Sequence, residues 1–443
     1  MTPGEPPATR INTTSQGRVG AFGFLKAARH PHAVSVTCAA AACALAPAYV
    51  IRWHVLSYPT TLLEVAILLT VAAFVIETAW RRSSVMWRGP LTAPAGIFLL
   101  AGAISIVVAA DHRGALGLFR AYLVEPMAFA VVVVTVVTSR QRALMLLAGL
   151  AVGGLVAGLA NSVVVLAALR AHTLDVTLTP PVVIYNTANA VALYLVPLIA
   201  ISASLSLHAT QLRERLVSGV FTVLAALAVL LSFSRGGYLA LAAVAVGLAV
   251  SHRLRWWLTS AGAVALGLLL LIPPFFARVR AEVDLNSGRN TLVGRFHLWD
   301  AALQMLRNRP LFGAGLSGFA AAIAPYWNPT HTDRFTYPHN ILLNFWSETG
   351  LLGVVAFGWI VVAALRLSLR GWRQSGSDWR PIHLGVLLAI VAVLVHGLVD
   401  VPYFKNDLSL EFWTLVAVSW SGVYRLTSPP TGERRTAGSK ADI

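Results

Sequence analysis

Two arginines and one histidine are the residues of this chain whose types and settings best suit chemistry. Arg235 precedes two glycines, Arg295 starts a predicted helix, and His339 ends the one long polar stretch. A guanidinium group binds phosphate oxygens in a planar, bidentate way. A histidine can accept a proton from a hydroxyl group near neutral pH. These residues therefore predict a site for an anion and a hydroxyl group.

Each of the three residues also has a structural alternative. An arginine at a membrane interface can extend its charge to water, a loop arginine can be solvated, and an interfacial histidine can cap a helix. An arginine near hydrocarbon, however, costs about 2.5–3.5 kcal/mol on insertion scales, which weighs against that alternative for Arg235. A cation at a helix N-terminus, as predicted for Arg295, is unfavourable unless an anion joins it. We therefore favour the functional interpretation.

The elements that must position these residues are membrane helices. Apolar residues make up 57% of the chain, charged residues make up 12%, and the mean hydropathy is +0.71. So few charges could not cover a soluble protein of 443 residues. Apolar runs of roughly 17–25 residues, which can cross a hydrocarbon core of about 30 Å as helices, recur along the chain. We predict an all-α polytopic membrane protein with about twelve spans, which start near Val34, Leu62, Leu91, Leu116, Leu144, Ala188, Leu216, Tyr238, Trp257, Asn340, Leu384 and Leu408.

The net charge of +16 is distributed in an alternating pattern. Basic clusters fall on every second connection, whereas the short loops between them hold isolated cations, which is the positive-inside bias. We therefore predict that both termini are cytoplasmic and that the long polar loop faces outward. This placement explains the charge without nucleic-acid binding. The clusters are Arg10/Arg18/Lys26/Arg29, Arg81/Arg82/Arg88, Arg140/Arg142, Arg213/Arg215, Arg253/Arg255, Arg366/Arg370/Arg373/Arg380 and Arg425/Arg434/Arg435.

The chain divides at its polar segments. We predict a cytoplasmic tail over residues 1–31, nine spans over 32–275, an outward loop over 276–338, three spans over 339–427 and a second tail over 428–443. The first span resembles a cleavable signal peptide, but Pro47 would follow the cut, so a retained helix is favoured. Cys38 and Cys43 lie in that span and are expected to be packing residues, with neither a disulfide nor a metal site.

Inside the outward loop, Phe296, Trp299, Leu303 and Leu306 recur at helical spacing. They predict an amphipathic helix that lies on the membrane surface. The helix should end before Pro310, because a helix seldom continues into proline.

The glycines that follow, Gly313, Gly315 and Gly318, fit the pattern G-x-G-x-x-G. A dinucleotide site also needs a preceding strand, so a compact turn with close backbone approach is the better interpretation. The outward loops contain no paired-carboxylate motif of the D-x-D type, which disfavours a metal-dependent sugar transferase. We expect no metal and no cofactor.

Other polar residues lie within the predicted spans. We expect Arg120 and Glu125 to form a contact inside the helix bundle, because intramembrane charges usually pair. His396 and Asp400 are four residues apart, so a structural hydrogen bond between them is expected. Glu348 is expected to face inward, as a structural residue or as the partner of an arginine.

Four short segments lie within the long polar loop or on either side of it along the chain. They are Ser234-Arg235-Gly236-Gly237, Gly294-Arg295 with Trp299, Pro310-Leu311-Phe312-Gly313-Ala314-Gly315 with Phe319, and His339-Asn340-Ile341-Leu342-Leu343 leading to Glu348-Thr349-Gly350-Leu351-Leu352-Gly353. Together they resemble the O-antigen ligase and O-antigen polymerase family of bacterial envelope glycan enzymes. The resemblance covers the chain from about Leu216 to Asp400, and each motif alone is weak.

The resemblance implies a metal-independent, GT-C-like glycosyltransferase in the bacterial cytoplasmic membrane. The donor would be a glycan on a polyprenyl diphosphate, and the acceptor a sugar hydroxyl on a lipid- or glycan-linked molecule, with membrane lipids as further partners. Arg235 and Arg295 would hold the diphosphate, and His339 would orient or deprotonate the acceptor. The supporting residues would be Asn189, Trp299, Asn340 and Glu348.

Three alternatives remain open at this point. A polymerase of the same family would differ from a ligase only in its acceptor. A transferase of the cell-wall polymerase type would depend on an outward acid, Asp284 or Asp333. A transporter or flippase also suits about twelve spans with both termini inside, but such proteins usually show internal repeats and binding sites near the midplane. The chain shows no evident repeat, and its unusual polar residues gather at one face, so an enzyme is favoured.

Overall fold

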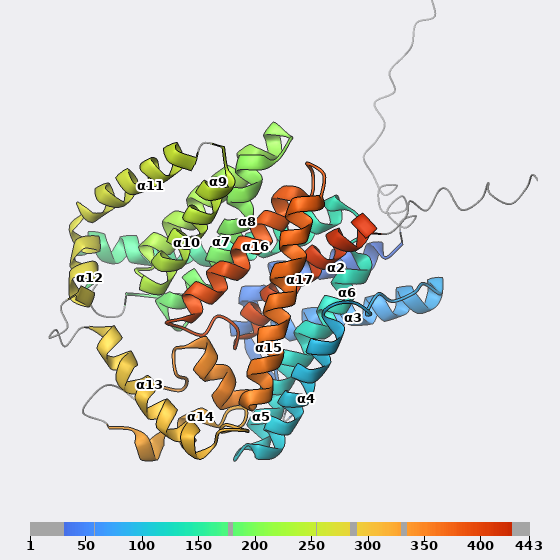
Figure 1. Cartoon of the computed structure of the whole chain (residues 1–443), viewed down its shortest axis with the longest axis horizontal. Helices are drawn as coiled ribbons and strands as arrows, with labels where there is room; N and C mark the ends of the chain where they lie inside the picture. The colour runs from blue at the N-terminus through green and yellow to red at the C-terminus, as the bar shows by residue number, and fades with distance from the viewer. Residues whose placement is uncertain are drawn as a thin grey trace, which may run out of the picture.

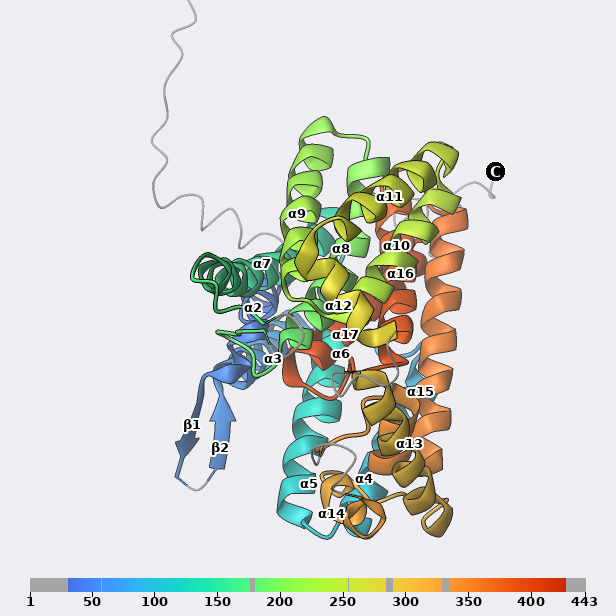
Figure 2. The same cartoon turned by 90° about the vertical axis from the view of Figure 1, so that its left-hand side faces the viewer.

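The computed structural model describes residues 31–56, 58–175, 180–253, 255–283, 290–328 and 335–427. The two predicted tails lie outside these residues except for Pro31, and so do Asp284 and Asp333. The described residues form a mostly helical protein (Figures 1 and 2), as predicted. The α-helices are α2 (Ala33–Ala44), α3 (Leu62–Arg81), α4 (Thr92–Val108), α5 (His112–Phe119), α6 (Glu125–Val136), α7 (Arg140–Arg170), α8 (Ala188–His208), α9 (Leu212–Leu231), α10 (Arg235–Ser251), α11 (Arg255–Leu270), α12 (Pro273–Val283), α13 (Thr291–Asn308), α14 (Phe319–Ala322), α15 (Ile341–Gln374), α16 (Arg380–Gly397) and α17 (Asn406–Thr427).

All the apolar segments predicted as spans are helical, but a count of twelve spans is not confirmed. Among the described residues, seven helices have the length and apolar composition needed to cross a membrane. Three further apolar helices, α2, α4 and α10, are shorter. The shortest of them, α2, has 12 residues and is therefore only about 18 Å long, against a hydrocarbon core of about 30 Å. It stops before a 3₁₀ turn, η1 (Ala46–Val50), that contains Pro47.

A short β-hairpin departs from the predicted all-α fold. Strands β1 (Arg52–Val55) and β2 (Tyr58–Thr61) pair antiparallel, and the hairpin projects from the bundle (Figure 2). An isolated two-stranded hairpin is marginally stable at best. Here its second strand is tied to the start of α3, because Glu64 accepts hydrogen bonds from the Tyr58 hydroxyl at 3.0 Å and the Thr60 hydroxyl at 2.9 Å.

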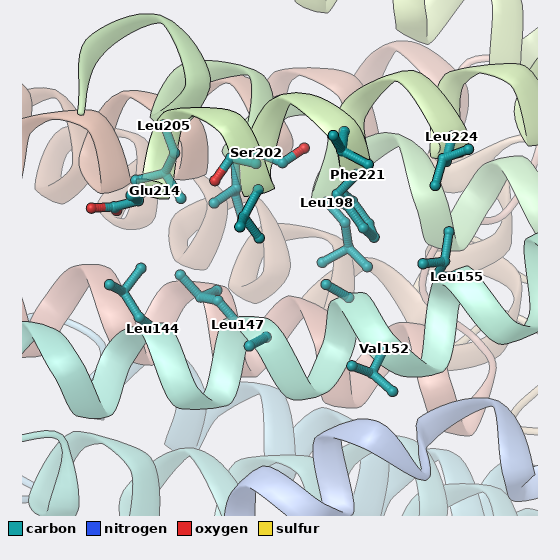
Figure 3. Close-up of a pocket in the computed structure, with 16 residues that line it drawn as sticks. Leu144, Leu147, Val152, Leu155, Leu198, Ser202, Leu205, Glu214, Phe221 and Leu224 are labelled. Carbon is teal, nitrogen blue, oxygen red and sulfur yellow. The ribbon is translucent and has the colours of Figure 1, made fainter. Parts of the chain in front are cut away.

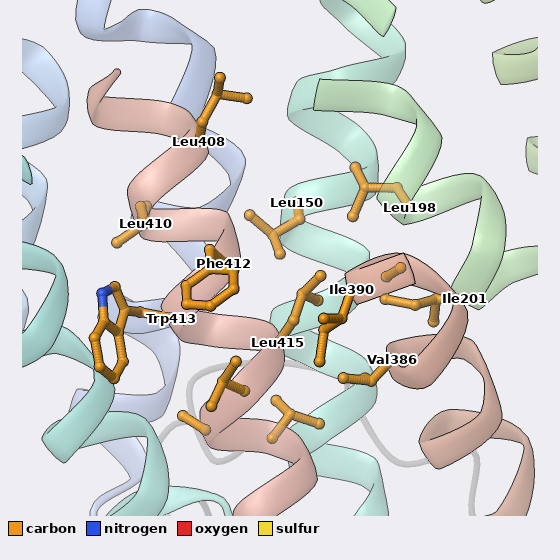
Figure 4. Close-up of a cluster of buried hydrophobic side chains, with 14 of the residues drawn as sticks. Leu150, Leu198, Ile201, Val386, Ile390, Leu408, Leu410, Phe412, Trp413 and Leu415 are labelled. Atoms are coloured by element: carbon orange, nitrogen blue, oxygen red, sulfur yellow. The ribbon is translucent and has the colours of Figure 1, made fainter. Parts of the chain in front are cut away.

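The core of the bundle is centred on α8. Of the most apolar window of α8, 89% is buried inside the protein, against 17% for α9, which therefore presents its apolar side chains outward. Side chains of α7, α8, α16 and α17 interlock in this core (Figure 4), with Leu150, Leu198, Ile390 and Leu415 among them. Such dense packing fixes the relative positions of the helices whose ends carry the polar residues.

The basic connections meet at one end of the bundle. Arg140, which begins α7, pairs with Glu214 of α9 and donates from Nε to the carbonyl of Asp378, before α16, at 2.7 Å. Arg142 donates to the carbonyl of Pro31 at 2.7 Å. These contacts bring together the N-terminal segment and the connections α6–α7, α8–α9 and α15–α16, which are four of the regions that the charge pattern places on one side of the membrane.

The predicted contact between Arg120 and Glu125 is present. Arg120 Nε lies 3.2 Å from Glu125 Oε1, and Arg120 also pairs with Glu64 of α3. Arg120 begins a π-helical turn, η2 (Arg120–Val124), that joins α5 to α6. The Arg120–Glu125 contact lies within one continuous helical segment, whereas the pair with Glu64 ties that segment to α3. Cys38 and Cys43 are free thiols within α2, also as predicted.

Candidate active site

Arg235 is held at the first residue of α10. The Ser234 hydroxyl caps this helix by accepting from the amide of Gly237 at 3.2 Å. A Cβ atom at Gly236 would lie 2.6 Å from the His396 ring, so α10 can approach α16 this closely only with glycine there. The Arg235 guanidinium then reaches across to the hydroxyl of Thr291, the first residue of α13.

Arg295 lies one turn beyond Thr291, the residue of α13 that Arg235 contacts. Asn290 caps α13 by accepting from the amides of Leu292 at 2.9 Å and Val293 at 3.2 Å. Thr291 and Arg295 are four residues apart and therefore share one face of the helix. The structure thus brings the two predicted arginines to one place from segments that are 60 residues apart in the chain.

Arg295 is a partly buried cation near the start of a helix. Its guanidinium is partly buried, which lowers the pKa of Arg295, whereas Asp400 and Tyr337 act in the opposite direction. Burial of a cation at a helix N-terminus is unfavourable in itself. A bound anion would relieve both costs.

His339 is fixed from both sides. Its backbone is left-handed, with φ of 49°, a conformation that costs a non-glycine residue roughly 1–3 kcal/mol. The preceding carbonyl, of Pro338, accepts from Trp299 Nε1 at 2.9 Å. The following residue, Asn340, caps α15 and donates to the carbonyl of Leu398 at 3.0 Å. Trp299 and Asn340 therefore hold the strained turn.

Asp400 orients the His339 ring. The Asp400 carboxylate lies 3.2 Å from His339 Nδ1 and accepts from Asn189 Nδ2 at 2.8 Å. Burial acts to raise the pKa of Asp400, but the interactions with His339, His396 and Arg295 outweigh it and hold that pKa well below its usual range. A fixed carboxylate on Nδ1 leaves Nε2 as the nitrogen that can face a substrate hydroxyl.

This pairing corrects the expected hydrogen bond between His396 and Asp400. The helix α16 ends at Gly397, so Asp400 lies beyond it and the four-residue spacing does not place the two side chains on one helical face. The sequence analysis missed Asp400 as the partner of His339. The available signal was Asp400 itself, an acidic residue in the short connection between α16 and α17.

Comparison with known families bears on the segment that carries these residues. A family model described as O-Antigen ligase matches residues 220–358, which include Arg235, Arg295 and His339.

Residues 220–358 therefore match the O-antigen ligase family.

The resemblance to the O-antigen ligase and polymerase family is thereby confirmed for this segment, and seven of the described helices are long and apolar enough to cross a membrane. The chain is also similar to a protein of Haemophilus influenzae described as uncharacterized, with 26% identity over 206 residues. That match covers 42% of this chain and 51% of the relative, so it spans about half the length of that protein. Asn189 and Asp400 lie outside the matched O-antigen ligase segment.

Glu348 of the O-antigen ligase domain has a structural partner. It accepts from the backbone amide of Ser317 at 2.6 Å. The turn that contains Gly313 also bonds to α15 just before its kink at Gly350, because Ala314 donates to the carbonyl of Ser347 at 2.7 Å. Glu348 therefore supports the glycine turn, and its contact with Ser317 gives no evidence for pairing with an arginine.

The glycine turn is compact, as predicted. Gly313 has φ of +65°, and a Cβ there would lie 2.3 Å from the carbonyl oxygen of Trp346.

We expect Gly313→Ala to lower the thermal unfolding temperature of the purified protein, because both the backbone conformation and the contact become strained. The conformation alone costs roughly 1–3 kcal/mol. Gly358→Ala in α15 is the matched control, since a Cβ there meets nothing within 4 Å. Equal stability of the two variants would contradict this role of the turn.

The helix predicted inside the long polar loop exists as α13, and that it lies on the membrane surface stays a prediction. Phe296 and Leu303 are 54% and 39% exposed, whereas Leu298, Ala302 and Met305 are buried. The buried cluster of α13 uses alanines, whose small side chains allow close packing against the segment that follows. The helix α12 begins at Pro273, so the predicted boundary at residue 275 falls within a helix.

An apolar cavity of about 450 Å³ lies between α7, α8 and α9 (Figure 3). Leu155 and Leu224 stand at one end of it, and Glu214, which pairs with Arg140, stands at the other. Leu224 is seven residues before the end of α9, or about 10 Å along the helix. The cavity thus runs from the end of the bundle where Glu214 pairs with Arg140 toward the turn that carries Arg235. In the described part of the chain, no three His, Cys, Asp or Glu residues are placed to hold a metal ion.

Proposed function

We propose that the protein transfers a glycan from a polyprenyl-diphosphate donor to a sugar hydroxyl of an acceptor, without a metal, on the outer face of the cytoplasmic membrane. The observation that carries this proposal is the bond from Arg235 to Thr291 of α13, which lies one turn before Arg295 on the same helix. The pairing of His339 with Asp400 supports it. A ligase is the first choice, and a polymerase of the same family differs only in the acceptor.

In the proposed reaction, the acceptor oxygen attacks the anomeric carbon of the donor glycan. The bond from that carbon to the diphosphate oxygen breaks, and polyprenyl diphosphate leaves with its electron pair. The two guanidinium groups neutralise the charge that develops on the leaving diphosphate, which is preorganised electrostatic stabilisation. The acceptor proton passes to His339 Nε2, and Asp400 stabilises the imidazolium that forms. A single displacement of this kind inverts the anomeric centre.

We place the lipid chain of the donor along α9. A diphosphate held at Arg235 would lie where α9 ends, at Leu231. The exposed apolar side of α9 and the cavity of Figure 3 lie below that point and offer an apolar path into the membrane.

The proposed orientation has both termini in the cytoplasm, the segment 276–338 and the site outside, and the helical segments 32–275 and 339–427 within the membrane. The gathering of basic connections at one end of the bundle supports it. A transporter or flippase is less well supported, because the arginines, His339 and Asp400 meet at helix ends and loops, whereas transporter sites are typically near the midplane.

The test is glycan transfer by the purified protein in detergent. The donor is a polyprenyl-diphosphate glycan, and the acceptor is in turn a lipid-anchored sugar and a second donor glycan. We expect transfer to continue at the same rate with a chelator, with one polyprenyl diphosphate released for each bond formed. Which acceptor reacts separates a ligase from a polymerase. A strict requirement for a divalent metal would contradict the proposed mechanism.

A further inference from the structure

We propose that a cleft between α15 and α17, at the basic end of the bundle, binds one anionic phospholipid. The cleft has a volume of about 440 Å³. Its wall on α15 includes Trp359, Arg366 and Arg370, and its wall on α17 includes Trp420 and Tyr424. It lies at the opposite end of α15 from His339, so the proposed lipid site is separate from the candidate active site.

The order of residues along α15 matches the order of groups in a phospholipid. Trp359, Ala363, Arg366 and Arg370 are spaced three or four residues apart, so they share one face of the helix. This face is apolar at Trp359 and charged at Arg370. The eleven-residue separation between Trp359 and Arg370 spans about 16 Å along the helix. That is close to half of a hydrocarbon core of about 30 Å. The cleft thus has the depth of one leaflet.

The charge of the cleft favours an anionic head group. Arg366 and Arg370 are one helical turn apart and both exposed, and none of the described residues that line the cleft is acidic. Arg370 Nε donates to Gln374 Oε1 at 2.9 Å, which holds this guanidinium beside the cleft. Two guanidinium groups at this spacing can bind the oxygens of one phosphate. Basic pockets between helices on the cytoplasmic side are typical sites for anionic lipid head groups.

The aromatic residues favour a lipid over a free anion. Trp359 and Tyr424 are each 48% exposed, so their rings face outward from the helix bundle. Trp420 packs against the backbone of Gly89, where a Cβ would lie 2.0 Å from its ring, so this tryptophan forms a fixed rear wall. Trp and Tyr side chains are enriched where the hydrocarbon core meets the head groups. A free phosphate would use the arginines but leave this apolar half of the cleft empty.

The test is native mass spectrometry of the full chain, with phosphatidylglycerol, phosphatidylcholine and inorganic phosphate as probes. We expect one tightly bound phosphatidylglycerol and no comparable binding of phosphatidylcholine. The double variant Arg366→Gln/Arg370→Gln should weaken that binding roughly 30-fold, since each basic residue near an anionic lipid contributes about fivefold. Arg213→Gln/Arg373→Gln is the matched control, because it removes the same charge from exposed arginines at the same end outside the cleft.

A second variant, Ala363→Trp, fills the cleft and leaves both arginines in place. We expect it to displace phosphatidylglycerol as well. Retained binding in this variant, equal loss in the control pair, or equal binding of phosphatidylcholine would overturn the proposal. Competition by inorganic phosphate at the concentration of the lipid would also overturn it, because it would indicate a site for a free anion.

Discussion

Replacing Arg295 by alanine lowers the rate of glycan transfer by about 10²–10³-fold, the usual effect of removing one preorganised group that stabilises developing charge. Arg295 is partly buried on the face of α13 that Arg235 also reaches, so no solvated cation can take its place on the diphosphate. Arg295→Lys should recover only part of the rate, because an ammonium group lacks the planar fork of guanidinium. The measurement is the initial rate with purified protein and a polyprenyl-diphosphate glycan.

Arg307→Ala is the control for this prediction. Arg307 lies in the last turn of the same helix, where it is exposed. Its loss removes the same charge from α13 and should leave the rate nearly unchanged. Wild-type activity in Arg295→Ala would refute the role proposed for the arginine pair.

Replacing Asp400 by asparagine should lower the rate by about 10²–10⁴-fold, the range that general acid–base catalysis contributes. The carboxylate holds His339 Nδ1 at 3.2 Å and is itself held by Asn189. Asparagine keeps the shape but cannot stabilise the imidazolium. Because the pKa of Asp400 lies well below its usual range, the carboxylate remains ionised throughout mildly acidic and neutral pH. A loss of activity between about pH 5 and 8 therefore does not come from Asp400.

His339 and Asp400 should act as a unit. The double variant His339→Gln/Asp400→Asn is expected to lose no more activity than the more damaging single variant, because groups that act together are not additive. Asp378→Asn is the control, since this acid lies at the other end of the bundle and contacts Arg140 through its backbone carbonyl. Effects of the two single changes that multiply would show that His339 works without Asp400.

The sequence revealed those features of the site that depend on local chemistry. Arg235 and His339 were predicted as site residues because a charged or titratable group at the edge of an apolar helix is costly and is usually functional. Trp299 and Asn340 were assigned supporting roles through the family resemblance. The compact glycine turn followed from residue type, since few residues other than glycine adopt the backbone of Gly313.

The features that the sequence did not reveal depend on contacts between distant segments. Asp400 is 61 residues from His339, and four-residue spacing suggested His396 as its partner. The packing of α13 against the protein through Leu298, Ala302 and Met305 depends on the segment that follows it, so the sequence pattern did not show it. The shortness of α2 likewise follows from the turn around Pro47, which an apolar run does not show.

The most direct test of the division of roles is donor binding measured apart from turnover. The affinity for a polyprenyl-diphosphate glycan is measured without an acceptor, for the wild type and for single variants at Arg235, Arg295, His339 and Asp400. We expect Arg235→Ala and Arg295→Ala to bind the donor about 10- to 100-fold more weakly, the loss of a charge-assisted hydrogen bond. His339→Gln and Asp400→Asn should bind it like the wild type and yet fail to transfer the glycan. Unchanged donor binding in both arginine variants would contradict the account.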